Sequence, residues 1–182
     1  MAKKRESVVT PEGRLVFPNL FTPTAFEEGK KETYNCLLVF PKGTDLSALN
    51  AAVKRALLEK FPKGATGARN PVRDGNEKAD DWGDLFRDAL YIRASSMYQP
   101  RVVDRAKQEI IDEKAVYGGC YARLVVSPYG YDTMGNKGVS IGLVAVQILR
   151  DGEPLGGGSA AVKLFDDLSE DAGGDLSDPF GN

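Results

Sequence analysis

The chain has 182 residues, 42% of them hydrophobic, which fits one soluble globular domain with appendages. It contains no histidine, and this excludes Ser–His–Asp and Cys–His catalysis as well as histidine-containing zinc sites. The net charge of −2 hides an asymmetry, because six of the 26 acidic residues lie in residues 166–182, where Lys and Arg are absent. A mildly basic body joined to an acidic segment suggests an anionic ligand, although a solubilising tail explains the charge equally well.

No stretch approaches 18 consecutive apolar residues, so a membrane span is not expected. The basic start MAKKRES is not followed by the apolar core of a secretory signal, and we expect a cytosolic protein. Cys36 and Cys120 lie far apart in apolar runs without a CxxC pair. They predict buried, reduced thiols rather than a disulfide or metal ligands, and neither a metal nor a cofactor is expected.

In chain order, residues 7–21 predict two short extended pieces around a Pro-Glu-Gly turn. Residues 33–40 (TYNCLLVF) predict a strand. Residues 44–62 contain the one clear helix, for which Thr44 or Asp45 is the expected cap. One face of this helix carries an apolar stripe, formed by Leu46, Leu49, Val53, Leu57 and Phe61.

Residues 63–88 are polar and glycine-rich and predict a long loop, of the kind that is usually functional or mobile. Strands are expected at 89–96 and 120–128, joined by a polar connection with a turn of helix near 108–113. The segment YGYDTMGNKG predicts a glycine-rich hairpin rather than a phosphate loop, because it lies between two strands instead of before a helix. Residues 139–152 predict a strand buried on both faces. Together these elements predict an α+β, mainly β protein with a small curved sheet or barrel.

One acidic segment resembles the carboxylate–Lys pattern of metal-dependent nucleases. Asp112, Glu113 and Lys114, with Asp104 upstream, carry the residue types that hold a divalent cation and assist an attacking water. Such triplets are common by chance, and this one lies in a polar connection rather than at the end of a core strand. A metal-dependent nuclease is therefore kept as the alternative function.

A stronger pattern is the alternation of aromatic and basic residues on two predicted strands. Residues i and i+2 share a face of a strand. Tyr91 and Arg93 should therefore project together, as should Tyr121 and Arg123, opposite core-facing neighbours: Leu90, Ile92 and Ala94 on one strand, and Cys120, Ala122 and Leu124 on the other.

This pattern suits single-stranded nucleic acid. Each unpaired base that stacks on an aromatic ring contributes about 1–3 kcal/mol, and cations neutralise the phosphates between the bases. The alternative is that the tyrosines fill a barrel and keep their hydroxyls at its rim. The candidate nucleic-acid contacts are Tyr91, Arg93, Tyr98, Arg101, Tyr121, Arg123, Tyr129, Tyr131 and Lys137, with Arg69, Arg73 and Trp82 from the long loop.

Several segments together resemble one protein family: VVTPEGRLVFPNLF, DLSALNAAV, VRDGNEK, QPRVVD and, most specifically, residues 116–157. The chain resembles, over about residues 7–157, a family of tailed-bacteriophage proteins with members recognised as single-stranded-DNA-binding proteins of OB fold. The resemblance implies a non-enzymatic protein that coats single-stranded DNA during phage replication or recombination in the host cytoplasm. It also implies an elaborated OB-fold-like Greek-key barrel with one main helix. The simplest such barrel has its helix between strands three and four, which would require three strands before residue 44.

We expect a DNA-binding domain at residues 1–157 and a flexible, disordered acidic C-terminal tail at residues 158–182. Carboxylates along a flexible peptide imitate a phosphate backbone, and a terminal aromatic ring imitates a base. The tail is therefore expected to compete with DNA or to recruit replication proteins, through Asp166, Asp167, Glu170, Asp171, Asp175, Asp178 and Phe180. An adaptor that captures basic partners through this tail without binding DNA is a third interpretation. A homo-oligomer is compatible with the sequence, which does not specify one.

Overall fold

Five strands of this computed structural model close into a barrel. The structure describes residues 5–25 and 27–155. In chain order, its elements are β1 (Val8–Val9), β2 (Gly13–Thr24), β3 (Thr33–Phe40), α1 (Ser47–Lys60), β4 (Arg73–Asp74), η1 (Gly75–Glu77), α2 (Ala79–Trp82), η2 (Asp84–Phe86), β5 (Leu90–Ser96), β6 (Arg101–Val103), η3 (Glu113–Ala115), β7 (Tyr121–Thr133) and β8 (Asn136–Arg150).

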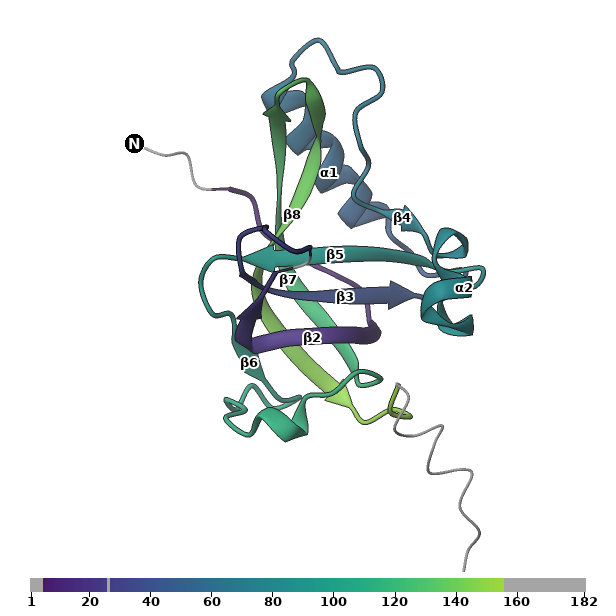
Figure 1. Ribbon diagram of the computed structural model, residues 1–182, viewed down its shortest axis with the longest axis vertical. Helices are drawn as coiled ribbons and strands as arrows, with labels where there is room; N and C mark the ends of the chain where they lie inside the picture. Colours follow the sequence, from purple (N-terminus) through teal and green to yellow (C-terminus); the bar gives the residue numbers. More distant parts are fainter. Residues whose placement is uncertain (1–4, 26, 156–182) are drawn as a thin grey trace, which may run out of the picture.

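The ring of the barrel runs β2, β3, β5, β8, β7 and back to β2. All neighbours in the ring are antiparallel except β5 and β8, which are parallel. This is a five-stranded Greek-key barrel of the OB type, as the sequence predicts. Figure 1 shows β2, β3 and β5 side by side, with the long β7–β8 hairpin crossing behind them and its tip rising beside α1.

In chain order, the helix α1 follows β3 and precedes β5, which are the second and third strands of the barrel ring. The simplest OB barrel would require three barrel strands before this helix, and only β2 and β3 precede it, because β1 has only two residues and pairs with β7 outside the ring. The prediction that Thr44 or Asp45 caps the helix is wrong, because the N-cap is Leu46, which makes no side-chain cap hydrogen bond. Asp45 accepts a hydrogen bond from the Ser47 N–H at 3.0 Å, and hydrogen bonds with the Ser47 side chain and backbone lower the pKa of Asp45. Leu46 and Leu49 of the predicted stripe are buried.

The closest approach of α1 to the barrel uses small residues that the stripe did not include. Ala52 and Ala56 are buried on the helix. On the facing strand β7, a Cβ atom added to Gly130 would overlap the Lys60 side chain and lie 3.2 Å from the Ala56 carbonyl oxygen. Gly130 is therefore a packing glycine, which allows the helix to lie directly on the hairpin.

The hairpin is longer than the sequence predicts. YGYDT continues β7, and the turn itself consists of Met134 and Gly135, both with positive φ (51° and 87°), as two-residue hairpin turns require. The expectation that residues 139–152 are buried on both faces is wrong, because β8 alternates and Val144 is 47% exposed. The predicted long loop 63–88 contains β4, α2 and two short 3₁₀ helices.

The hydrophobic residues form two separate clusters. The larger one fills the barrel and includes both cysteines, and burial raises the pKa of the Cys36 thiol to about 12. The smaller one lies on the outer face of the sheet, where α2 and η2 cover one end of β3 and β5, and consists of Val16, Leu37, Val39, Ala79, Phe86, Ala89 and Tyr91. No helix in residues 5–25 or 27–155 is long and apolar enough to cross a membrane.

Candidate nucleic-acid interface

The outer face of the sheet is hollowed beside the smaller cluster. A central hollow of about 620 Å³ lies over β3, β5 and β8, between the β2–β3 connection and the 69–82 segment. It shares Leu37 and Arg93 with a second hollow of about 410 Å³ beside Phe17. It shares Thr33 and Ser95 with a third hollow of about 370 Å³ beside Tyr98. We call the three the central, Phe17 and Tyr98 hollows, and together the sheet trough.

Strand register determines which side chains form the floor of the trough. In the β3–β5 ladder Leu37 lies opposite Arg93, and Asn35 lies opposite Ser95. Alternate residues point inward, so Ile92 is completely buried in the barrel, as is Ala94. The predicted division of this strand into two faces is thus correct for Ile92, Arg93 and Ala94. Leu90, predicted to face the core, is instead 41% exposed at the start of the strand.

The central hollow is strongly basic. Only one of its lining residues, Glu27, is acidic, whereas six are cationic: Lys30, Lys31, Arg69, Arg73, Lys78 and Arg93. Burial lowers the pKa of the Arg93 guanidinium, and the Glu27 carboxylate acts in the opposite direction. A guanidinium starts from so high a pKa that it remains charged at neutral pH. The hollow therefore presents an excess of positive charge to solvent, as a phosphate backbone requires.

Aromatic side chains lie beside the cations of the central hollow. Trp82, at the end of α2, is partly exposed and lines the central hollow, with the Lys78 Nζ 5.2 Å from its ring centroid. The Phe17 ring packs edge-on against it at 5.6 Å and is 50% exposed. Tyr131 lines the same hollow from β7. Three rings from different elements thus lie beside the cations.

Tyr91 requires a correction. It faces the trough side of the sheet together with Arg93, as predicted, but it is only 6% exposed. Its ring packs against Trp82 at 5.9 Å and Phe86 at 5.5 Å. The α2–η2 segment covers this ring, so Tyr91 supports Trp82 from below rather than offering an open face to a base.

Backbone pairing holds the 69–82 segment at the trough. The Arg69 N–H donates to the Lys137 carbonyl oxygen at 2.9 Å, and the Val139 N–H donates to the Arg69 carbonyl oxygen at 3.1 Å. Between these bonds, a Cβ atom on Gly138 would lie 2.9 Å from the Arg69 oxygen and 2.8 Å from the Tyr131 hydroxyl. A glycine is needed here because the loop and the strand approach so closely.

The Tyr98 hollow contains two further predicted contacts. Tyr98 is 84% exposed, and Tyr129 lines the hollow from β7. The Arg5 guanidinium lies 4.2 Å from the Tyr129 ring centroid. This end of the trough therefore combines two tyrosines and a cation from the N-terminal segment.

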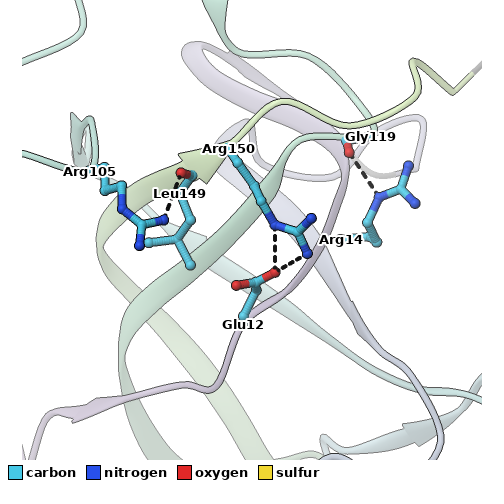
Figure 2. A network of polar contacts seen from close by, with 6 residues as sticks. All are labelled: Glu12, Arg14, Arg105, Gly119, Leu149 and Arg150. Atoms are coloured by element: carbon cyan, nitrogen blue, oxygen red, sulfur yellow. Dashed lines mark hydrogen bonds and ion pairs between the residues drawn. The ribbon is translucent and has the colours of Figure 1, made fainter.

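The Tyr121–Arg123 end of β7 lies away from the trough, whereas Tyr129 and Tyr131 further along the same strand line it. Arg14 and Arg150 have their guanidinium carbons 4.7 and 3.7 Å from the Tyr121 ring centroid. Figure 2 shows that these arginines donate to the protein itself: Arg150 to Glu12 at 2.8 Å, and Arg14 to the Gly119 carbonyl oxygen at 2.8 Å. These hydrogen bonds hold the strand ends together where the barrel closes. Tyr121 packs against both arginines and therefore has a structural role.

Three other candidates also lie outside the residues that line the trough. Arg123 donates to Gln147 Oε1 at 2.7 Å, and Arg101 is exposed on β6. Lys137 lies near the hairpin tip, with its Nζ 5.5 Å from the Phe61 ring centroid. The structure thus gathers eight of the twelve candidates along the trough: Arg69, Arg73, Trp82, Tyr91, Arg93, Tyr98, Tyr129 and Tyr131.

Two acidic residues of the nuclease hypothesis serve local turns. Asp104 accepts hydrogen bonds from the N–H groups of Ala106 and Gln108, and Asp112 accepts one from Lys114. Among the residues that the structure describes, no three His, Cys, Asp or Glu side chains are grouped to hold a metal ion. The proposed tail contacts, from Asp166 to Phe180, lie outside the described residues.

Several trough residues are absent from the predicted contacts, among them Lys30, Lys31, Lys78 and Phe17. Lys30 and Lys31 stand in a polar stretch between two predicted strands, and Lys78 precedes Trp82 by four residues in the predicted loop. Phe17 lies in the extended piece of residues 7–21 and is not among the predicted contacts. No local signal points to Phe17, because strict alternation would place it on the same inward face as Leu15.

An OB barrel with a basic, aromatic-bordered trough on its sheet face defines the class of OB-fold nucleic-acid-binding proteins. The family model described as "Enterobacter phage Enc34, ssDNA-binding protein" matches residues 6–176, and the chain belongs to this family. The family consists of single-stranded-DNA-binding proteins, which are not enzymes, so the nuclease alternative is not supported.

Individual relatives agree with this placement. The chain is 37% identical over 170 residues to "Putative protein p50" of Acyrthosiphon pisum secondary endosymbiont phage 1, covering 86% of this chain and 90% of that protein. The structure of the bacteriophage Enc34 single-stranded DNA-binding protein in complex with ssDNA has a TM-score of 0.72 at 21% identity, over 82% of this chain and 89% of that chain. The bacteriophage T7 single-stranded DNA binding protein gp2.5 has a TM-score of 0.60 at 12% identity, over 90% and 97%.

Proposed function

We propose that this protein binds single-stranded DNA along the sheet trough without a strong sequence preference, and coats it during phage replication and recombination in the host cytoplasm. The observation that carries the proposal is the central hollow, whose lining contains six cations and one carboxylate together with the partly exposed Trp82. Cations neutralise phosphates of any sequence, and aromatic rings stack on any base. Duplex DNA keeps its bases stacked inside and offers nothing to these rings.

The fluorescence of Trp82 can report DNA binding, because Trp82 is the chain's single tryptophan and it lines the trough. Titration with a dT oligonucleotide should quench its fluorescence, and a duplex of the same length should bind much more weakly. If all six cations contact phosphates, the slope of log affinity against log salt should approach about −4, at about −0.7 per phosphate. A salt-independent affinity, or equal affinity for duplex, would contradict the proposal.

A charge-removal variant separates the trough from general basicity. Lys30 and Lys31 are both exposed and both line the central hollow. The double substitution K30A/K31A should make the salt slope shallower by about 1.4. The matched control K42A/K54A removes two exposed lysines that do not line the trough, and its slope should equal that of the unmodified protein.

We also propose a role for the acidic segment. Its six carboxylates and Phe180 would compete with DNA for the sheet trough, and once displaced they would be available to basic replication proteins. The charge complementarity between this segment and the central hollow supports the proposal. Removing the segment tests it, because a chain without its internal competitor should bind DNA more tightly.

A further inference from the structure

The Phe17 hollow differs in chemistry from the central hollow. Its lining includes a single cation, Arg93, whereas Phe17, Asn19 and Asn35 give it an exposed ring above an amide floor. Its volume of about 410 Å³ lies in the range of small-ligand sites, roughly 300–1,000 Å³. Such a site suits one flat heterocycle better than a phosphate.

A β-bulge presents the ring. Val16 pairs with Leu37, and the next β2–β3 pair is Asn19 with Asn35, so β2 has one more residue than β3 in this interval. The backbone of Phe17 is left-handed there, with φ of 48°, which a non-glycine residue adopts only at a cost. A bulge re-aims the side chain that it carries. Phe17 is thereby directed outward to 50% exposure beside Trp82.

The buried Asn35 determines which atom of Asn19 a ligand meets. Asn35 Nδ2 donates to the Thr33 carbonyl oxygen at 2.9 Å, and a carbonyl can only accept, so the orientation of this amide is fixed. Asn35 Oδ1 must then accept, and it does so from Asn19 Nδ2 at 3.1 Å. The same Nδ2 donates to the Phe17 carbonyl oxygen at 3.2 Å. Both amide hydrogens of Asn19 are thus engaged, and its Oδ1 is the group left to offer to a ligand.

An amide oxygen discriminates between bases. Cytosine and adenine carry an exocyclic amino group that donates to it, whereas uracil and thymine present a carbonyl oxygen at the corresponding position and would be repelled. We propose that the Phe17 hollow is a nucleobase pocket in which Phe17 stacks on the base and Asn19 Oδ1 accepts from an exocyclic amine. The pocket would give the protein a modest preference for amino-bearing bases, superimposed on the sequence-tolerant binding in the rest of the trough. This inference rests on the proposed binding of single-stranded DNA.

The test compares dC12 with dU12, two oligonucleotides of equal length whose bases differ at the amino or carbonyl group and the adjacent ring nitrogen. Every position carries the same base, so the register of the strand on the protein does not matter. Affinities are measured by Trp82 quenching at one salt concentration. The unmodified protein should bind dC12 more tightly by about 3- to 10-fold, the effect of one hydrogen bond.

Three variants assign the preference. Asn19→Ala should bring the dC12-to-dU12 affinity ratio close to one. Phe17→Ala, at an exposed ring whose loss leaves the core intact, should weaken both oligonucleotides and also abolish the preference. The control Tyr98→Ala removes an exposed ring at the other end of the trough, and it should weaken both oligonucleotides while the preference remains.

The outcomes separate the two proposals. If the unmodified protein binds dC12 and dU12 equally, or if either Asn19→Ala or Phe17→Ala retains the preference, the nucleobase pocket is refuted while single-strand binding stands. If neither oligonucleotide binds, the proposed function itself fails. Thermal unfolding of Asn19→Ala monitors the stability that Asn35 loses with its partner, and Phe17→Ala tests the preference independently of that loss.

Discussion

Gly138 offers a sharp test of how the trough is assembled. Alanine at this position would place its Cβ 2.9 Å from the Arg69 oxygen and 2.8 Å from the Tyr131 hydroxyl. Real Cβ contacts are not that short, so the segment that carries Arg69 must move away from β8. The movement would break the two backbone hydrogen bonds between them, at a cost of about 1–3 kcal/mol.

The consequence of Gly138→Ala is measurable in two assays. The barrel ring does not include the Arg69 segment, so the variant should remain folded with a modestly lower melting temperature. Titration with a dT oligonucleotide should show weaker binding and a salt slope shallower by about 0.7, the loss of one phosphate contact.

The matched control is Gly118→Ala, where the nearest atoms to an added Cβ are 3.9 Å away. It should leave both the affinity and the salt slope unchanged. If folded Gly138→Ala binds DNA with the affinity and slope of the unmodified protein, pairing with β8 does not hold Arg69 at the DNA.

Three further predictions concern other parts of the chain. A protein that ends at Phe165 should bind single-stranded DNA more tightly, most visibly at low salt, because it has lost its internal competitor. Phe86→Ala should lower the free energy of unfolding by about 3–5 kcal/mol and weaken DNA binding, because this fully buried ring supports Trp82. Cys36, whose pKa is raised to about 12, and the equally buried Cys120 should not react with a thiol reagent at pH 8 until denaturant is added.

Each of these has a clear negative result. Equal affinity of the truncated and full-length chains across salt concentrations would leave only partner recruitment for the acidic segment. Unaltered DNA affinity in a destabilised Phe86→Ala protein would show that the packing of Trp82 on Phe86 does not contribute to DNA binding. Rapid labelling of either thiol in the native protein would show that the barrel opens readily.

The strands could be predicted from the sequence because they are specified locally. The β-branched and aromatic run at residues 33–40 predicts one barrel strand, and residues 89–96 predict another, in which alternation gives the faces of Ile92 and Arg93. The composition of residues 63–88 indicated a functional loop containing Arg69, Arg73 and Trp82. The resemblance of residues 116–157 to a phage family indicated the OB barrel that the strand order confirms.

The rest depends on contacts between distant segments. Tyr91 and Tyr121 have the same Tyr-x-Arg pattern, but α2 covers the first, and two arginines pack against the second. No property of either strand alone distinguishes them. The outward position of Phe17 follows from a bulge defined by pairing with β3, and that pairing is not visible in β2 by itself.

The order of strands around the ring also constrains how the molecule forms. β8 pairs with both β5 and β7, and its parallel alignment with β5 joins residues about fifty positions apart in the chain. Such pairing carries a large loop-closure entropy, so folding should be slow for a domain of this size. A fragment that stops before Asn136 would leave two neighbouring strands with open edges, and nascent chains of that length are the species most exposed to aggregation.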